Sequence, residues 1–255
     1  MFQQDRWNDG GARGLAASWT TDGHTFHRSA LPFSLCAPGG ADFERASDPW
    51  VSTGPDGTVY ASGEGVDFTR STRSALLAAT SRDGGRTWQN LTTTHVDQQP
   101  FFNDKPSLTA DPVRHGTAYQ VWNRLDNDPP GPSSLDGPGY ISLTRDGGRT
   151  WSKGRAFVDT STVPNTQTIG HVIVANRRTA TLYDYVATVV RDLLGATGPA
   201  VKAVESVQLL GPADAAARAR AMGDGLNDVV KELVTFARDE RTPDEVDDKG
   251  MEMVE

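Results

Sequence analysis

The sequence lacks the features that define several large classes of protein. Cys36 is the only cysteine among 255 residues, so an internal disulfide is excluded. No apolar run is long enough to span a membrane as a helix. No signal peptide follows Met1, so an extracellular location would require a signal on an upstream segment. The five histidines show no metal-ligand spacing, and we expect no metal site and no cofactor.

An excess of positive charge is also missing. The formal net charge is −8, whereas a nucleic-acid-binding domain usually has a basic footprint, so no nucleic-acid partner is expected. Most of the negative charge comes from residues 239–255, which hold eight acidic and two basic side chains. This composition, with few apolar residues, predicts a disordered and solvated acidic tail.

What the sequence does have is a repeated phrase. Ser81–Trp88 reads Ser-Arg-Asp-Gly-Gly-Arg-Thr-Trp, and Thr144–Trp151 repeats it with one change. A shortened version occupies Thr20–Phe26. The aspartates of the three copies are 61 and 63 residues apart. A period of this length indicates a chain built from equivalent supersecondary units.

The residue types of the phrase are those of a hairpin turn. The glycines supply positive φ angles, and the aspartate can accept hydrogen bonds from backbone N–H groups that follow it. The tryptophan starts the returning strand and can cover the turn. We therefore expect structural rather than catalytic roles for the fixed positions of the repeat. These are Asp22, Asp83, Gly85, Trp88, Asp146, Gly148 and Trp151.

The phrase resembles the Asp-box, or bacterial neuraminidase repeat, of sialidase-like β-propellers. The resemblance implies that each box joins the third and fourth strands of a four-stranded blade, on the face away from the active site. It also implies a glycan ligand and, as the reaction, exo-sialidase-like hydrolysis of a terminal glycosidic bond.

Strand and turn patterns around the boxes predict how many blades are present. Residues 45–95 and 101–158 each contain four predicted strands, with turns rich in glycine, proline and aspartate. Residues 1–28 fit the last three strands of an earlier blade, and residues 170–186 fit the first two strands of a later one. The predicted fold is therefore mainly β, a partial sialidase-like β-propeller over residues 1–187. Because the ring is incomplete, self-association could close it.

The pattern changes after residue 187. Val201, Val204 and Leu210 fit one face of a short helix, and apolar residues within 222–236 recur with the period of a second, amphipathic helix. We therefore predict a helical region over residues 188–238, followed by the acidic tail.

The resemblance places a site opposite the boxes, at the starts of first strands and in the loops between second and third strands. Glycoside hydrolysis needs a proton donor and a nucleophile or base, and a carboxylated sugar needs arginines. The candidate catalytic residues are Asp48 and Asp104, which are interpreted as equivalent positions; their recurrence fits a structural role equally well. The candidate substrate-binding residues are Asp5, Arg6, Lys105 and Arg124. The same face also offers Glu64, Arg70, Asp126 and His171.

The sequence departs from the sialidase pattern in three respects. It has no Arg-Ile-Pro phrase, no assignable triad of arginines and no identifiable Tyr–Glu pair. Three hypotheses therefore stay open: a glycoside hydrolase, a non-catalytic binding or scaffold module, and an inactive fragment or fusion. The sugar and the catalytic nucleophile cannot be assigned from the sequence.

Overall fold

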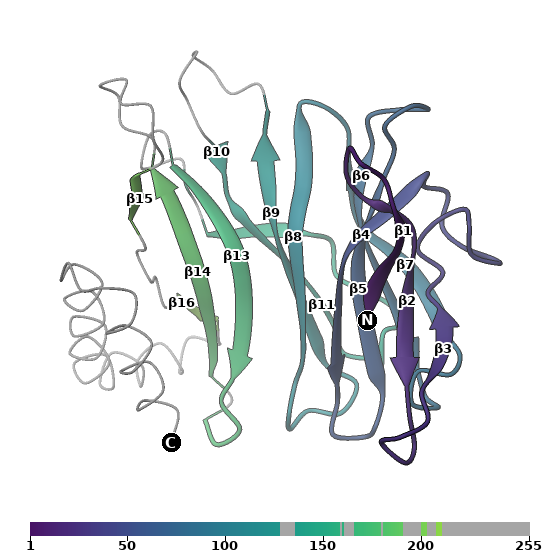
Figure 1. Ribbon diagram of the computed structural model, residues 1–255. Helices are drawn as coiled ribbons and strands as arrows, with labels where there is room; N and C mark the ends of the chain where they lie inside the picture. Colours follow the sequence, from purple (N-terminus) through teal and green to yellow (C-terminus); the bar gives the residue numbers. More distant parts are fainter. Residues whose placement is uncertain are drawn as a thin grey trace, which may run out of the picture.

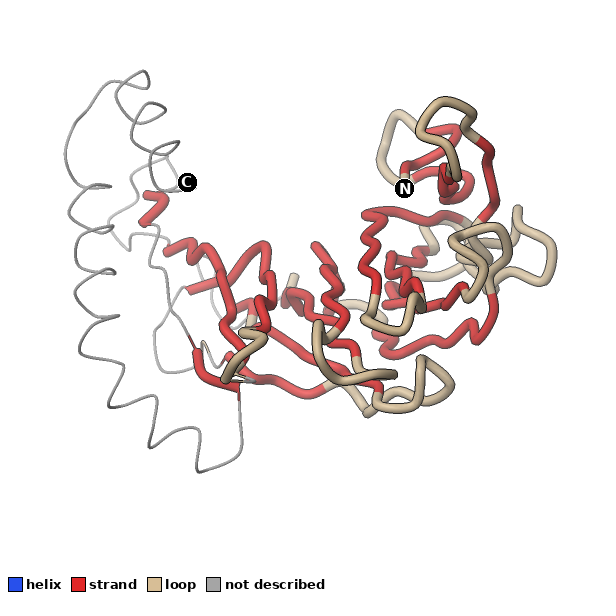
Figure 2. The backbone as a smooth tube through the Cα atoms, turned by 90° about the horizontal axis from the view of Figure 1, so that it is seen from below, coloured by secondary structure: helices blue, strands red, loops and turns tan. Residues whose placement is uncertain are grey.

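The described part of the protein is all β. The computed structural model describes residues 1–127, 136–158, 160, 166–179, 181–190, 200–202 and 208–210. Every regular element in these ranges is a strand. The described residues contain no helix that is long and apolar enough to cross a membrane. Seen from below, the strands follow one another along an open arc that begins at the N terminus (Figure 2).

The strands fall into four successive antiparallel groups along this arc (Figure 1). The first group contains three strands, with β2 between its two neighbours. They are β1 (Phe2–Arg6), β2 (Ala12–Trp19) and β3 (His27–Ala30). These match the three strands predicted for residues 1–28. One residue pair, Ala12 with Ala46, connects this group to the second.

The second group is a complete four-stranded meander in which each strand pairs with the next. Its strands are β4 (Arg45–Thr53), β5 (Val59–Val66), β6 (Ser74–Ser81) and β7 (Gln89–Asp97). All four strands predicted in residues 45–95 are present. The 81–88 repeat is the turn between the third and fourth of them.

The third group follows the same plan, with a short additional strand that connects it to the fourth group. Its members are β8 (Phe101–Ala110), β9 (Ala118–Asp126), β10 (Asp136–Gly137), β11 (Gly139–Thr144) and β12 (Arg155–Val158). Strand β10 pairs with β9 and, in parallel, with the first strand of the fourth group. The 144–151 repeat again separates the last two strands.

The fourth group begins as predicted but departs from the prediction at its end. Its strands are β13 (Thr166–Ala175), β14 (Leu182–Val190), β15 (Ala200–Lys202) and β16 (Gln208–Leu210). Both short strands pair with β14. At the described ends of the short helix predicted over 201–210 the backbone pairs with β14, and residues 203–207 between them lie outside the described residues. The second predicted helix, over 222–236, and the 239–255 tail lie outside the described residues.

The hydrophobic core lies between successive groups. Leu15 and Phe33 pack with Leu77 between the first and second groups. Tyr60 packs with Leu108 between the second and third, and Val121 with Ile173 between the third and fourth. Each group therefore buries its faces against its neighbours along the chain.

The repeated turns share one hydrogen-bonding scheme. Asp83 Oδ1 accepts from the backbone N–H groups of Arg86 and Thr87, at 3.0 and 2.9 Å. Asp146 accepts from the N–H and hydroxyl of Thr150, at 3.0 and 2.6 Å. These hydrogen bonds lower the pKa of Asp146 to about 2. Trp88 also donates from Nε1 to Ser29 Oγ, at 3.0 Å, which links the second turn to the first group.

Candidate functional site

The first strands of three groups carry the same irregularity. In β4, β8 and β13 the register shifts by a two-residue bulge, at Asp48-Pro49, Lys105-Pro106 and Gly170-His171 respectively. The leading residue of each bulge has a positive φ angle: 46° at Asp48, 52° at Lys105 and 71° at Gly170. A bulge redirects the side chains next to it. The bulged residues of the three strands therefore occupy equivalent positions and lie at the same level of the molecule.

The bulges correct one interpretation of the sequence. Asp48 is structurally equivalent to Lys105 and not to Asp104, which occupies the position of Ser47, one residue before the bulge. The two Asp-containing phrases looked alike only because each precedes a proline. The structure nevertheless brings Asp48 and Asp104 together, because β4 and β8 are neighbours (Figure 1).

Three carboxyl groups meet at this level. One oxygen from each of Asp48, Glu64 and Asp104 lies within 4.8 Å of the others. The Lys105 ammonium lies 3.4 Å from Asp48 Oδ2 and 3.8 Å from Asp104 Oδ1. These four residues are called the carboxyl cluster below.

Two glycines place Glu64 in the cluster. Gly63 and Gly65 flank it on β5, and a Cβ atom there would come within 2.7 Å of Leu15 and 2.6 Å of Phe43. Because side chains alternate along a strand, the glycine face packs closely against the first group while Glu64 projects from the opposite face.

Glu64 is held in an unusual environment for an acid. Its side chain is almost fully buried, and Oε1 has no hydrogen-bond partner. Burial, followed by the negative charges of Asp104 and Asp48, raises the pKa of Glu64 well above its ordinary value. A hydrogen bond shared with Asp104 acts in the same direction, because the protonated carboxyl donates it. The site therefore favours the protonated form of Glu64.

Lys105 provides the positive charge of the cluster. The charges of Asp104 and Asp48 raise its pKa, so the ammonium is protonated at neutral pH. Three carboxyl groups are also the ligands that Ca²⁺ or Mg²⁺ prefers. The Lys105 ammonium, however, already lies where it compensates two of them.

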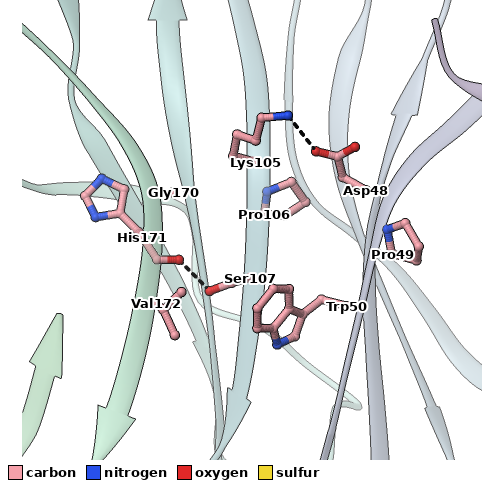
Figure 3. Close-up of a pocket in the computed structure, with 9 residues that line it drawn as sticks. All are labelled: Asp48, Pro49, Trp50, Lys105, Pro106, Ser107, Gly170, His171 and Val172. Carbon is pink, nitrogen blue, oxygen red and sulfur yellow. Dashed lines mark hydrogen bonds and ion pairs between the residues drawn. The ribbon is translucent and has the colours of Figure 1, made fainter. Parts of the chain in front are cut away.

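A small cavity opens beside the cluster (Figure 3). Its volume is about 230 Å³, below the roughly 300–1,000 Å³ of drug-sized ligand pockets, so it suits a ligand of single-ring size. The cavity is bounded by the three bulges. Its lining residues are Asp48, Pro49, Trp50, Lys105, Pro106, Ser107, Gly170, His171 and Val172. The Trp50 indole is 40% exposed and offers a flat apolar wall.

His171 contributes its backbone rather than its ring to this cavity. Figure 3 shows the imidazole pointing away from Lys105 and Asp48. The ring is fully buried, with Nδ1 2.7 Å from Asp184 and Nε2 2.9 Å from Thr168. Its carbonyl oxygen accepts a hydrogen bond from Ser107 at 2.7 Å, which joins β13 to β8.

Arg124 lies in a different network from the carboxyl cluster. Its Nε and Nη2 donate to the two oxygens of Asp97, at 2.8 and 2.9 Å. Its guanidinium also lies over the rings of Phe101 and Tyr140. Two nitrogens of the Arg124 guanidinium on β9 therefore already bind the carboxylate of Asp97 on β7.

The other predicted residues are also spread over the molecule. Arg70 pairs with Asp42, Glu44 and Asp67 in the loop network after β5. Asp5 and Arg6 are exposed at the end of β1, and neither is among the residues of the cluster or the cavity. Asp126 ends β9, where it pairs in register with Phe101 and Asp136.

Two features of the site were not singled out from the sequence. Glu64 was placed on this face but given no role, although an acid between two glycines in an apolar strand is the signal that could have identified it. Trp50 was read only as part of a strand. Its exposure depends on the neighbouring bulge, which no local pattern predicts.

Comparison with known proteins adds information on the fold. No protein-family model and no curated protein matches the sequence. Among solved structures, an α-L-arabinanase from Penicillium chrysogenum, in complex with arabinobiose, matches 79% of this chain with a TM-score of 0.52 and 14% identity. At such identity the likeness shows the fold alone.

Two further structures match at lower TM-scores. A protein of unknown function from Dyadobacter fermentans has a TM-score of 0.46 and 16% identity over 69% of this chain. A sialidase from Trypanosoma rangeli has a TM-score of 0.40 and 8% identity over 80% of it. The present chain spans 60% of the arabinanase, 51% of the Dyadobacter protein and 36% of the sialidase.

Proposed function

We propose that residues 1–187 form a partial Asp-box β-propeller with two whole and two partial blades, and that the carboxyl cluster belongs to a glycan-hydrolysing site. The turn scheme of the repeats, the core between groups and the fold likeness to an arabinanase support the architecture. The cluster lies on the first strands β4 and β8 and on the second strand β5, at the ends of the blades away from the repeats, where the resemblance implies a site.

One observation carries the functional proposal. Asp48, Glu64 and Asp104 share one small site, but their surroundings differ in the way that glycoside hydrolysis requires. Burial raises the pKa of Glu64 and favours its protonated form, whereas Asp48 lies 3.4 Å from the Lys105 ammonium. In glycoside hydrolases, a protonated carboxyl group usually serves as the acid and a neighbouring ionised one as the nucleophile.

In the proposed reaction a sugar ring lies in the cavity against Trp50. Asp104, which shares the proton of Glu64, donates it to the leaving glycosidic oxygen. The Asp48 carboxylate then attacks the anomeric carbon, and water hydrolyses the resulting ester with Asp104 as the base. The short distance between carboxyl oxygens, within 4.8 Å, is closer to the roughly 5–5.5 Å typical of retaining enzymes than to the 6.5–9.5 Å typical of inverting ones.

A panel of fluorogenic glycosides tests the proposal. We expect slow turnover by the intact chain, and Asp48→Asn and Asp104→Asn should each lower kcat by at least about 100-fold while circular dichroism stays unchanged. The matched control is Asp42→Asn, which alters an exposed carboxylate that pairs with Arg70 and should leave the rate unchanged. If turnover is equal in all four proteins, the assignment of the cluster is wrong.

A non-catalytic glycan-binding module is the second candidate function, and one observation favours it. Lys105 already pairs with both aspartates, and Glu64 is closed off from solvent. The cluster would then shape the cavity without transferring a proton. Sugar binding that is weakened by Trp50→Ala, in a protein that turns over no glycoside, would select this function.

A further inference from the structure

The charge of the cluster restricts the ligands that its cavity can accept. The cluster brings three carboxyl groups together with a single ammonium, that of Lys105. The ammonium is shared by both aspartates, at 3.4 and 3.8 Å, so it is already compensated. Of these groups, Asp48 and Lys105 line the cavity, and Asp104 pairs with the same ammonium from outside the lining.

No guanidinium is available at this cavity to offset that charge. Its lining, among the described residues, contains no arginine. Of the three arginines that the sequence placed on this face, Arg124 pairs with Asp97, and Arg70 pairs with Asp42 and Asp67. Arg6 is exposed at the end of β1 and is not among the lining residues. A carboxylate on a ligand would therefore meet Asp48 and a lysine that already pairs with two aspartates, without an arginine partner.

The remaining walls are apolar. Trp50 and Pro49 stand on one side and Pro106 and Val172 on the other, around a cavity of about 230 Å³ (Figure 3). Such walls suit the C–H faces of a sugar ring, while Asp48 can accept hydrogen bonds from its hydroxyls.

We propose that the site recognises an uncharged sugar and rejects carboxylated sugars such as uronic and sialic acids. This inference rests on the proposed function and names its substrate class. It separates the protein from the carboxylate-binding chemistry of the family that its repeats resemble, because no arginine lines the described cavity.

Matched pairs of ligands test the inference. Binding of the methyl glycosides of glucose and galactose, and of the corresponding uronic acids, is measured on the full chain by ligand-observed NMR at low and at high salt. N-acetylneuraminic acid is included as a second carboxylated probe. We expect each uncharged sugar to bind about tenfold or more tightly than its uronic acid, and the gap to narrow as salt screens the repulsion.

Two variants connect the result to the cluster. Asp48→Asn removes one negative charge and should narrow the gap at low salt, whereas Asp42→Asn, at an exposed position, should leave it unchanged. Equal or tighter binding of the carboxylated sugars overturns the inference and leaves the proposed glycan site standing. If no sugar binds and no glycoside is turned over, the proposed function fails, and the inference fails with it.

Discussion

At the scale of single residues, the functional case depends on where charge is buried. Glu64 lies behind Asp48 and Asp104 with one oxygen that has no hydrogen-bond partner. An ionised carboxylate without partners is strongly disfavoured there, and a protonated one is tolerated. The same burial that makes Glu64 a proton store also makes it sensitive to pH.

The free energy of unfolding should therefore depend on pH through the ionisation of Glu64. Above its ordinary pKa of 4.5 the unfolded chain has lost this proton, whereas the folded chain retains it. The folded state then binds more protons, so this group lowers stability as pH rises, by about 1.4 kcal/mol per pH unit from pH 4.5 up to the raised pKa.

Glu64→Gln is the variant that isolates this effect. The amide has the same shape, can donate to Asp104 and does not titrate. Urea unfolding at pH 5, 6 and 7 should show the variant gaining stability relative to the wild type as the pH rises. Parallel pH profiles for the two proteins would show that Glu64 ionises normally.

Backbone strain is a second property of this scale. Asp48 and Lys105 have positive φ angles that residues with a Cβ atom adopt at a cost of about 1–2 kcal/mol. Gly170 occupies the equivalent position without that cost. Strained residues cluster at binding sites, and here two of them line the proposed cavity, so the strain supports the assignment of the site.

At the scale of elements, the repeated turns organise each group without taking part in its chemistry. Asp146 accepts hydrogen bonds from Thr144 and Thr150, and the adjoining Gly148 packs closely on Thr80 of the second group. The turn at Asp22 has similar hydrogen bonds but is exposed throughout. The two turns should therefore contribute different amounts to the free energy of unfolding.

Asp146→Ala and Asp22→Ala test this difference. Removing Asp146 leaves backbone donors near a buried glycine without their partner, which should cost about 1–2 kcal/mol of unfolding free energy. Removing Asp22 should cost less, because water replaces the lost acceptor. Thermal and urea unfolding of both variants, with glycan binding as a parallel readout, measure the two effects. An equal loss in both variants, or altered binding by Asp146→Ala, would contradict this view of the turns.

The elements also show how far the sequence could lead. Strands β4 to β9 were predictable because alternating apolar residues and turn residues are local signals. The bulges were not predictable, since a one-residue shift of register depends on which residues of the neighbouring strand are paired. That is why Asp48 was matched with Asp104 and not with Lys105. Partner choice is equally non-local: nothing near Arg124 in the sequence indicates that Asp97 takes both ends of its guanidinium.

The C-terminal part of the chain also shows that a local pattern does not determine which strands pair. Val201 and Leu210 fitted a helical period, but the described residues around them pair with β14. Short apolar segments satisfy both patterns, and an available strand edge decides between them. Local signals thus predicted the strands of the arc better than its continuation.

At the scale of the whole molecule, the described strands form an arc whose ends do not meet (Figure 2). Strand β1 pairs with β2 alone among the described strands, which leaves one of its edges without backbone partners. Such an edge is a template for pairing with another strand. The architecture therefore predicts that the chain associates with itself.

Light scattering on a size-exclusion column tests this expectation. We expect a mass of about twice that of one chain at high concentration, falling toward the single-chain value on dilution. Gln4→Lys places a charge on the open edge of β1 and should shift the protein toward the monomer, because charged side chains oppose edge-to-edge pairing. Gln89→Lys, at an exposed position on β7, is the matched control and should keep the wild-type mass. A monomer at every concentration would show that β1 needs no second copy, and the glycan site would then have to be complete within one arc.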